Sequence, residues 1–242
     1  MKKYVLLLLL LPAYFTSLAI TDEQLWFAYI HLGRVHKHWG YWVDIQHRTK
    51  NQFANSFHQD LFRVGATWYA TNDVRITIGH AEILTFPSLT NQAFIRPEHR
   101  PWQQVFYTYT DKTKRARFST YLRAEQRFMR KVSGEKLIEG YNFRQRFRYN
   151  AMLVVGLNNK EFKQGSWGIV LNDEVFINAY SQDKVKAFDQ NRAFVGFSYN
   201  ITTPLQLHLG YLNVYSLTPK GHDVVHAIRL AAFHTIDWRK SK

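Results

Sequence analysis

Apolar and polar residues alternate one by one over long stretches of this 242-residue chain, and this pattern limits its fold more than any other feature. The clearest stretch is residues 140–157, where Phe147 and other apolar residues occupy one set of alternate positions. Arg144, Arg146 and Arg148 occupy the other set. A helix would spread these arginines around its circumference, whereas a strand places them on one face. The pattern therefore indicates β-structure with two chemically different faces.

The same alternation recurs along the chain and predicts eleven strands. They are expected at residues 24–33, 39–48, 57–70, 74–84, 102–111, 115–130, 140–157, 167–178, 190–201, 205–214 and 223–236. Single-chain bacterial barrels normally have an even number of strands. We therefore expect either that one strand is missed or that one segment near the N-terminus is not in the wall, which makes about twelve strands the prediction and ten the alternative.

The length of the alternating segments favours a transmembrane barrel over a soluble fold. Several segments alternate for ten or more residues, whereas strands of soluble sheets are usually about 5–6 residues long and membrane-crossing strands about 9–11. Aromatic residues make up 16% of the chain, and several tryptophans, such as Trp39, Trp68 and Trp167, stand near strand ends, as in an interfacial girdle. A soluble periplasmic β-barrel or sandwich that binds a ligand remains the alternative.

Connections between the predicted strands fall into two groups. Short polar turns are expected near residues 71–73, 111–114, 157–160 and 202–204. Longer connections are expected near residues 86–100, 132–139, 179–189 and 216–222. The prediction is therefore a single, all-β, antiparallel transmembrane barrel with short periplasmic turns and longer outer loops.

The N-terminus has the three-part layout of a secretory signal peptide. A cationic start at Lys2 and Lys3 precedes an apolar run, and Ser17-Leu18-Ala19 fits a cleavage site. We expect a signal peptide over residues 1–19 and one outer-membrane barrel domain over residues 20–242. The chain has no cysteine, which excludes disulfides, thiolate metal sites and cysteine nucleophiles.

If lipid covers the apolar face, the opposite face of two consecutive strands lines the lumen with arginine. The residues expected there are Arg117, Arg123, Arg127, Arg144, Arg146 and Arg148 with Glu125, joined from other strands by Arg48, Arg63, Arg75, Arg192, Asp44 and Glu174. One interpretation is a packed network of ion pairs that fills a narrow barrel. The other is an electropositive lumen that binds or passes anions.

Nucleic-acid binding and catalysis both find little support. The formal net charge of +14 is compatible with nucleic acid, but basic and aromatic residues alternate and so face opposite sides. Two weak candidates for chemistry are His36-x-His38 as a metal grip and Glu98-His99 as an acid–base pair. No serine stands in a nucleophile motif. We expect no catalytic residue, no metal and no cofactor.

Several segments resemble domain-of-unknown-function family 2490. They are residues 172–178, 188–192 and 210–213, together with 96–104, 122–128 and the terminal strand 222–233, and the family pattern includes Asn172, Glu174, Phe188, Asp189, Gln190, Asn191 and Arg192. The resemblance covers essentially all of the predicted mature chain. It implies an outer-membrane β-barrel of Gram-negative bacteria with no established activity, and it supplies no catalytic residue.

The sequence thus predicts a non-catalytic, porin-like outer-membrane barrel that acts as a small channel or as an anion- or ligand-binding barrel with an arginine-rich lumen. Its expected partners are outer-membrane lipid and a small anionic solute, not nucleic acid. An outer-membrane lipid-modifying hydrolase is the principal alternative, favoured only if a serine or an acid–histidine pair converges at the outer rim.

Overall fold

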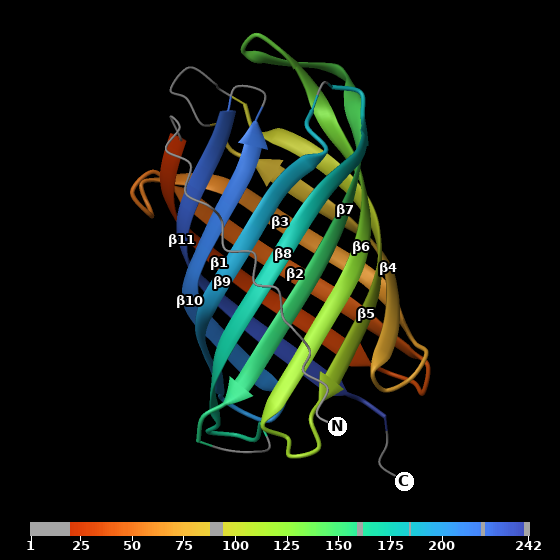
Figure 1. The fold of residues 1–242 in the computed structure, drawn as a ribbon. Helices are drawn as coiled ribbons and strands as arrows, with labels where there is room; N and C mark the ends of the chain where they lie inside the picture. The colour runs from red at the N-terminus through yellow and green to blue at the C-terminus, as the bar shows by residue number, and fades with distance from the viewer. Residues whose placement is uncertain (1–19, 88–93, 159–161, 184, 219–220, 240–242) are drawn as a thin grey trace.

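Eleven strands and no helix are formed by the residues that the computed structural model describes, which are 20–87, 94–158, 162–183, 185–218 and 221–239. The predicted signal peptide lies outside these residues. The strands are β1 (Ile20–Arg34), β2 (Trp39–Lys50), β3 (Ser56–Tyr69), β4 (Val74–Thr85), β5 (Arg96–Thr110), β6 (Ala116–Ser133), β7 (Lys136–Gly156), β8 (Trp167–Ser181), β9 (Phe188–Asn200), β10 (Leu205–Thr218) and β11 (Gly221–Asp237) (Figure 1). The described residues contain no helix long and apolar enough to cross a membrane.

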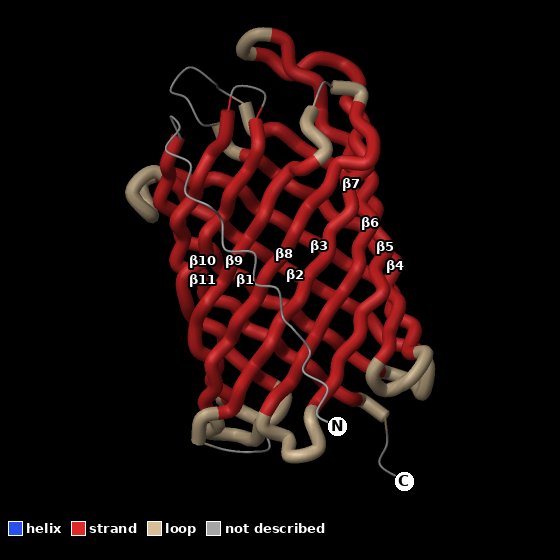
Figure 2. The backbone as a smooth tube through the Cα atoms, in the orientation of Figure 1, coloured by secondary structure: helices blue, strands red, loops and turns tan. Residues whose placement is uncertain are grey.

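The strands close into a barrel in which each strand is antiparallel to its neighbours in sequence, and β1 and β11 meet to complete it (Figure 2). This seam is parallel, with a register that runs from Ile20 opposite Asp223 to Arg34 opposite Asp237. The predicted closed all-β barrel is confirmed. The described residues form eleven strands, one at each predicted alternating segment, so the expectations of about twelve or ten strands and of a wrongly assigned segment are not met. An odd number can close because the seam between β1 and β11 is parallel.

Strand bounds differ most from the predicted ones in β5, which begins at Arg96 instead of residue 102. The sequence predicts a longer connection near residues 86–100, and the strand begins inside it, in a stretch that contains Pro97 and Pro101. Proline has no N–H to donate, so it weakens a ladder without preventing an extended backbone. Accordingly, the β5–β6 pairing runs from His99 directly to Trp102 and omits the two residues between them.

The sequence predicts short turns at one rim and longer loops at the other, but the two rims, at the top and bottom of Figure 1, do not differ in this way. The longest connections, residues 86–95 and 157–166, lie one at each rim. The upper rim differs from the lower one because β6 and β7 continue above it and turn at Gly134 and Glu135. Gly134 has φ of 57°, a left-handed conformation that glycine adopts without strain. The predicted loop at 132–139 is therefore mostly strand.

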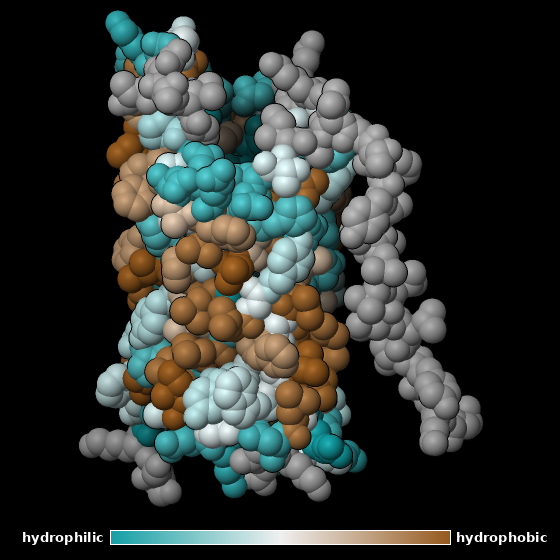
Figure 3. Space-filling model, turned by 90° about the vertical axis from the view of Figure 1, so that its left-hand side faces the viewer, coloured by the Kyte–Doolittle hydropathy of each residue, from teal (hydrophilic) through white to brown (hydrophobic). Residues whose placement is uncertain are grey.

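Alternation divides the strands between two environments. Large apolar side chains face outward, and Ile78, Leu122 and Phe197 are 61%, 56% and 56% exposed. Figure 3 shows such residues as a brown band between more polar ends of the molecule. The inward residues on the same strands are mostly buried, and they include both apolar and charged side chains.

Trp102 shows how tightly the interior is packed beside the charged residues. Its side chain is 1% exposed and lies over Gly65 and Gly79, which face each other on β3 and β4. A Cβ atom at Gly79 would come within 2.8 Å of the indole ring, and one at Gly65 within 3.2 Å. Glycine at these two positions therefore makes room for a large ring inside the barrel.

Candidate functional site

The hairpin of β6 and β7 directs six arginines into the lumen. Their apolar neighbours on the same strands, including Leu122 and Phe147, are exposed on the outside. The register places Arg123 opposite Arg148 and Arg127 opposite Arg144, with Glu125 opposite Arg146 between them. Like charges directly opposite each other are unfavourable, so this hairpin requires carboxylates to compensate its charge.

Glu125 is the carboxylate at the centre of the network. It is 1% exposed, and its Oε2 accepts hydrogen bonds from Nη2 of Arg146 at 2.6 Å and Nε at 3.0 Å. Its Oε1 lies 2.8 Å from Nη2 of Arg148. Arg100 and Arg123 approach the same carboxylate at 3.6 and 3.9 Å. One buried carboxylate thus faces four guanidinium groups.

Two further carboxylates extend the network toward the upper rim. Glu98 pairs with Arg127 through two parallel contacts of 2.8 and 2.9 Å and with Arg100 at 2.7 Å. Asp189 accepts a hydrogen bond from Arg146 at 2.9 Å. Sequence reasoning did not assign these partners, because residue 98 was placed in a loop and Asp189 was named only as part of the family pattern.

Glu174 joins the network from β8. It lies 3.4 Å from Nη1 of Arg148 and 3.7 Å from Nη1 of Arg192, and it accepts a hydrogen bond from the Tyr121 hydroxyl. Asp44 and Arg63, both expected in the lumen, lie 3.5 Å apart on β2 and β3. These side chains are therefore also largely neutralised.

The other family-pattern residues are distributed around β8 and β9. Gln190 bonds Arg192 at 2.7 Å and Ser216 at 2.6 Å. Asn172 donates to the carbonyl of Ala151. Phe188 packs its ring near Tyr215. Asn191 faces the other way and donates to Asp173 at 2.8 Å. The pattern thus supports one wall of the lumen instead of a single compact site.

A second set of lumen arginines has no ion-pair partner among the described residues. Their guanidinium carbons lie instead over aromatic rings. Arg75 lies over Phe106 at 3.5 Å, Arg48 over Trp26 at 3.8 Å, Arg117 over Phe162 at 4.5 Å and Arg229 over Phe194 at 5.5 Å. Arg48 also bonds two glutamine oxygens. Stacking on rings is favourable for a cation but does not neutralise its charge.

A cavity of about 180 Å³ lies in the lumen, between the Glu125 network and the lower rim. It is smaller than the roughly 300–1,000 Å³ typical of pockets for drug-sized ligands. Its polar lining comprises Arg63, Arg75, Arg123, Arg148, Arg192 and Arg229 with Asp44, Gln46, Asn150, Asn172, Glu174 and His208, and the rest is mainly apolar and aromatic. Arginines outnumber carboxylates in this lining.

The two weak candidates for chemistry are not assembled into sites. His36 is exposed in the β1–β2 turn, and His38 contacts the carbonyl of Tyr69. Glu98 and His99 are neighbours on one strand, so Glu98 faces the lumen and His99 faces outward. In the described part of the chain, neither His36 nor His38 belongs to a group of three metal-ligating side chains.

Acid–histidine groups do converge elsewhere, on the outward face of the upper half of the barrel. His47 on β2 contacts Asp60 on β3 at 2.6 Å. Glu82 on β4 contacts both His80 and His99. Sequence reasoning missed these groups, although His80-x-Glu82 has the spacing that places two side chains on one face of a strand.

Comparison with known proteins adds a family but no activity. Residues 23–225 match a family described as "Protein of unknown function (DUF2490)". No curated protein and no solved structure matches the chain significantly. The family match confirms the resemblance noted in the sequence over residues 23–225.

Proposed function

This chain belongs to the DUF2490 family of proteins of unknown function, and from that premise we propose that it is a non-catalytic outer-membrane β-barrel that binds a small anion in its lumen. The observation that supports anion binding most directly is the cavity whose wall includes arginines without carboxylate partners. Membrane location, export and ligand are each part of the proposal.

The outward surface supports the membrane part of the proposal. Large apolar side chains on all sides of the barrel stay exposed, which is unusual for a soluble monomer. In a bilayer the same surface would contact lipid, and the closed ladder leaves no unpaired strand edge in the hydrocarbon. The projecting β6–β7 hairpin suits the outer side of the membrane, where longer extensions are usual.

Packing of the lumen favours binding over free permeation. Trp102, Arg123 and Glu125 are each 1–2% exposed, so side chains fill the barrel at their level. An open pore would leave these groups in contact with water. We therefore propose a barrel that holds an anion, and in planar bilayers we expect no steady conductance from the folded protein.

Arg229 offers a direct test, because it lines the cavity and has no ion pair among the described residues. In Arg229→Gln we expect the affinity for inorganic phosphate or succinate, measured by isothermal titration calorimetry in detergent, to fall about tenfold or more, since a charge-assisted hydrogen bond contributes about 1.5–3 kcal/mol. Arg117→Gln is the matched control, because Arg117 stacks on a ring outside the cavity lining.

Two results would contradict the proposal. One is the absence of saturable binding of either anion to folded protein, and the other is an equal loss of affinity in both variants. Steady anion-selective conductance would show that the protein is a channel and not a barrel that only binds an anion. If the protein were found in the soluble fraction instead of in carbonate-washed membranes, the proposed outer-membrane location would be wrong.

A lipid-modifying hydrolase is the second candidate, because acid–histidine groups meet on the outward face of the upper half of the barrel. Lipid substrate would approach from that side if the barrel lies in a membrane. The proposal is tested by incubating folded protein with outer-membrane lipid and measuring released fatty acid or headgroup. No release above that from a His80→Ala, His99→Ala double variant would exclude it.

A further inference from the structure

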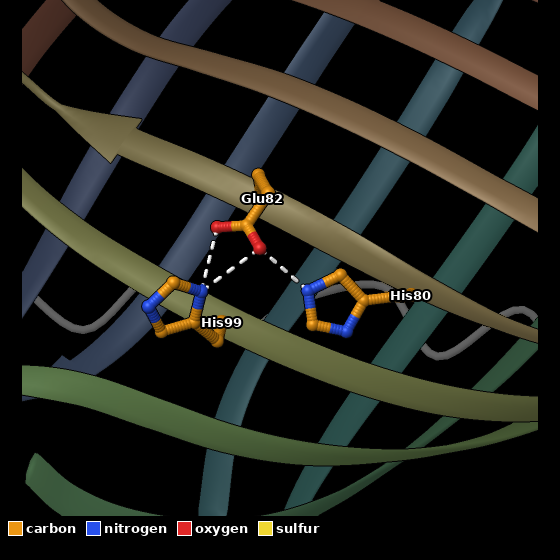
Figure 4. A group of neighbouring side chains, drawn as sticks. All are labelled: His80, Glu82 and His99. Atoms are coloured by element: carbon orange, nitrogen blue, oxygen red, sulfur yellow. Dashed lines mark hydrogen bonds and ion pairs between the residues drawn. The ribbon is translucent and has the colours of Figure 1, made fainter.

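We propose that His80, Glu82 and His99 form a binding site for Zn²⁺ on the outside of the barrel. His80 and Glu82 are two residues apart on β4 and therefore share its outward face. His99 is the direct cross-strand neighbour of Glu82 on β5. Figure 4 shows the three side chains pointing toward one another from the two strands.

The donor atoms are already gathered at one point. Nε2 of His80 lies 2.6 Å from Oε1 of Glu82, and Nδ1 of His99 lies 2.8 Å from the same oxygen. All three donor atoms lie within 4.8 Å of one another. Ligands of a tetrahedral zinc stand about 3.4 Å apart at Zn–N distances of about 2.0–2.1 Å. A small opening of the side chains would admit the ion between the two ring nitrogens and the carboxylate.

Tyr141 on β7 selects the ring nitrogen that His99 offers to a metal. The Tyr141 hydroxyl lies 3.2 Å from Nε2 of His99, and the two ring centroids are 5.5 Å apart. When Nε2 carries the proton and donates it to this hydroxyl, the lone pair of Nδ1 points to Glu82. Histidine ligands of metals are usually oriented in this way by a second hydrogen bond. Tyr141 is therefore a positioning residue.

The donor set indicates zinc instead of calcium or magnesium. Two imidazoles and one carboxylate are a known ligand set for Zn²⁺, whereas Ca²⁺ and Mg²⁺ take mostly oxygen ligands. Three protein ligands leave a fourth coordination position, which water can occupy. The three side chains are 42–45% exposed, so the ion can enter from outside the barrel without any rearrangement of the wall.

A nearby group provides a matched control. His47 and Asp60 also lie on adjacent strands, also face outward and also contact each other at 2.6 Å. They offer two donors where the proposed site offers three. Zinc held by one histidine and one carboxylate is expected to bind much more weakly, so His47→Ala changes a surface histidine without removing the proposed site.

The experiment uses the full chain, folded in detergent, without a polyhistidine tag and stripped with a chelator. Zn²⁺ alone is titrated by calorimetry, and Co²⁺ is added separately because its visible absorption reports tetrahedral nitrogen and oxygen ligands. We expect one tight Zn²⁺ per chain, at least a tenfold loss of affinity in His99→Ala and in Glu82→Gln, and no change in His47→Ala. Tyr141→Phe is expected to weaken binding less than His99→Ala does.

Folding of each variant is checked by its heat-dependent mobility in gels. The substituted side chains face outward and are half-exposed, so the substitutions leave the packing of the interior unchanged. Equal Zn²⁺ affinity in the wild type and in a His80→Ala, His99→Ala double variant would overturn the proposal. So would a loss in His47→Ala as large as that in His99→Ala, because zinc would then be bound by scattered surface histidines.

Discussion

Two regions of one lumen bury arginine in opposite ways. In the network around Glu125, Arg146 and Arg148 make contacts of 2.6 and 2.8 Å with a single carboxylate. In the wall nearer the lower rim, Arg75 and Arg229 have no ion pair among the described residues and lie over the rings of Phe106 and Phe194. Arginine side chains are therefore held in ion pairs in one region and keep an uncompensated charge in the other.

The difference predicts which arginines stabilise the fold and which the proposed anion would contact. A buried ion pair is costly to break, because the remaining partner keeps its charge without compensation. Replacing an arginine that has no carboxylate partner leaves no buried charge uncompensated. The cavity is lined by arginines of both kinds, and Arg75 and Arg229 are the ones whose charge the proposed anion would compensate.

The largest effect is expected from Glu125→Gln, which removes the charge shared by four guanidinium groups while keeping the size of the side chain. We expect the free energy of unfolding to fall by about 5 kcal/mol, the upper end for breaking buried pairs. Urea unfolding in detergent measures this change. Glu135→Gln, in the exposed β6–β7 turn, is the control, and equal stability of the two variants would remove the distinction between the regions.

Arginine-to-methionine substitutions in the two regions compare them directly. Arg146→Met leaves Glu125 and Asp189 short of a partner, and we expect it to lower the free energy of unfolding by about 3 kcal/mol. Arg75→Met removes an unpaired charge and keeps an apolar chain over Phe106, so we expect a change near zero or a gain of up to about 1 kcal/mol. The same urea midpoints test both, and an equal loss would show that ring stacking stabilises these arginines as well as carboxylates do.

The smallest effect concerns an exposed carboxylate at the lower rim. Hydrogen bonds from the backbone N–H of Ala116 and the Thr113 hydroxyl lower the pKa of Asp111. Its contribution is therefore present above the unfolded pKa of about 3.9 and lost as pH falls through the lower folded value. We expect Asp111→Ala to be slightly less stable than wild type near neutrality and equal to it in strong acid.

Asp73→Ala is the matched control for Asp111, because the Asp73 carboxylate lies in the neighbouring turn and accepts no hydrogen bond that the described residues show. Urea midpoints of the two variants across the acid range compare them. A difference between Asp111→Ala and wild type that persisted at the lowest pH would contradict the assignment to the ionised carboxylate.

Alternation predicted the strands well wherever their two faces meet different surroundings. It failed where both faces meet the same surroundings, as in the part of β6 and β7 above the upper rim, where exposed residues such as Glu135 and Lys136 follow no period. It also failed at the start of β5, which lies within the longer connection expected near residues 86–100. The eleven alternating segments matched the eleven strands that the described residues form, whereas the expectation of an even number was wrong, because it assumed an antiparallel seam and the seam here is parallel.

The direction of the arginines followed from the sequence, but their partners did not. Glu125 faces Arg146 on the adjacent strand and was within reach of pattern reasoning. Asp189 reaches Arg146 from β9 across β8, so the contact depends on the registers of two strand pairs, which the sequence alone does not fix. The group of His80, Glu82 and His99 required the β4–β5 register, which the unrecognised first part of β5 concealed.

The parallel seam has a consequence for how this chain can be rearranged. In a barrel with an even number of strands, the two ends share a rim, and a short turn can rejoin them in a circularly permuted chain. Here β1 begins at the upper rim and β11 ends at the lower one. With 15 residues in β1, these points are about 50 Å apart along the strand. A linker that joins the end of β11 to the start of β1 would need about fifteen extended residues running the length of the wall. A short turn therefore cannot produce a circularly permuted form of this barrel.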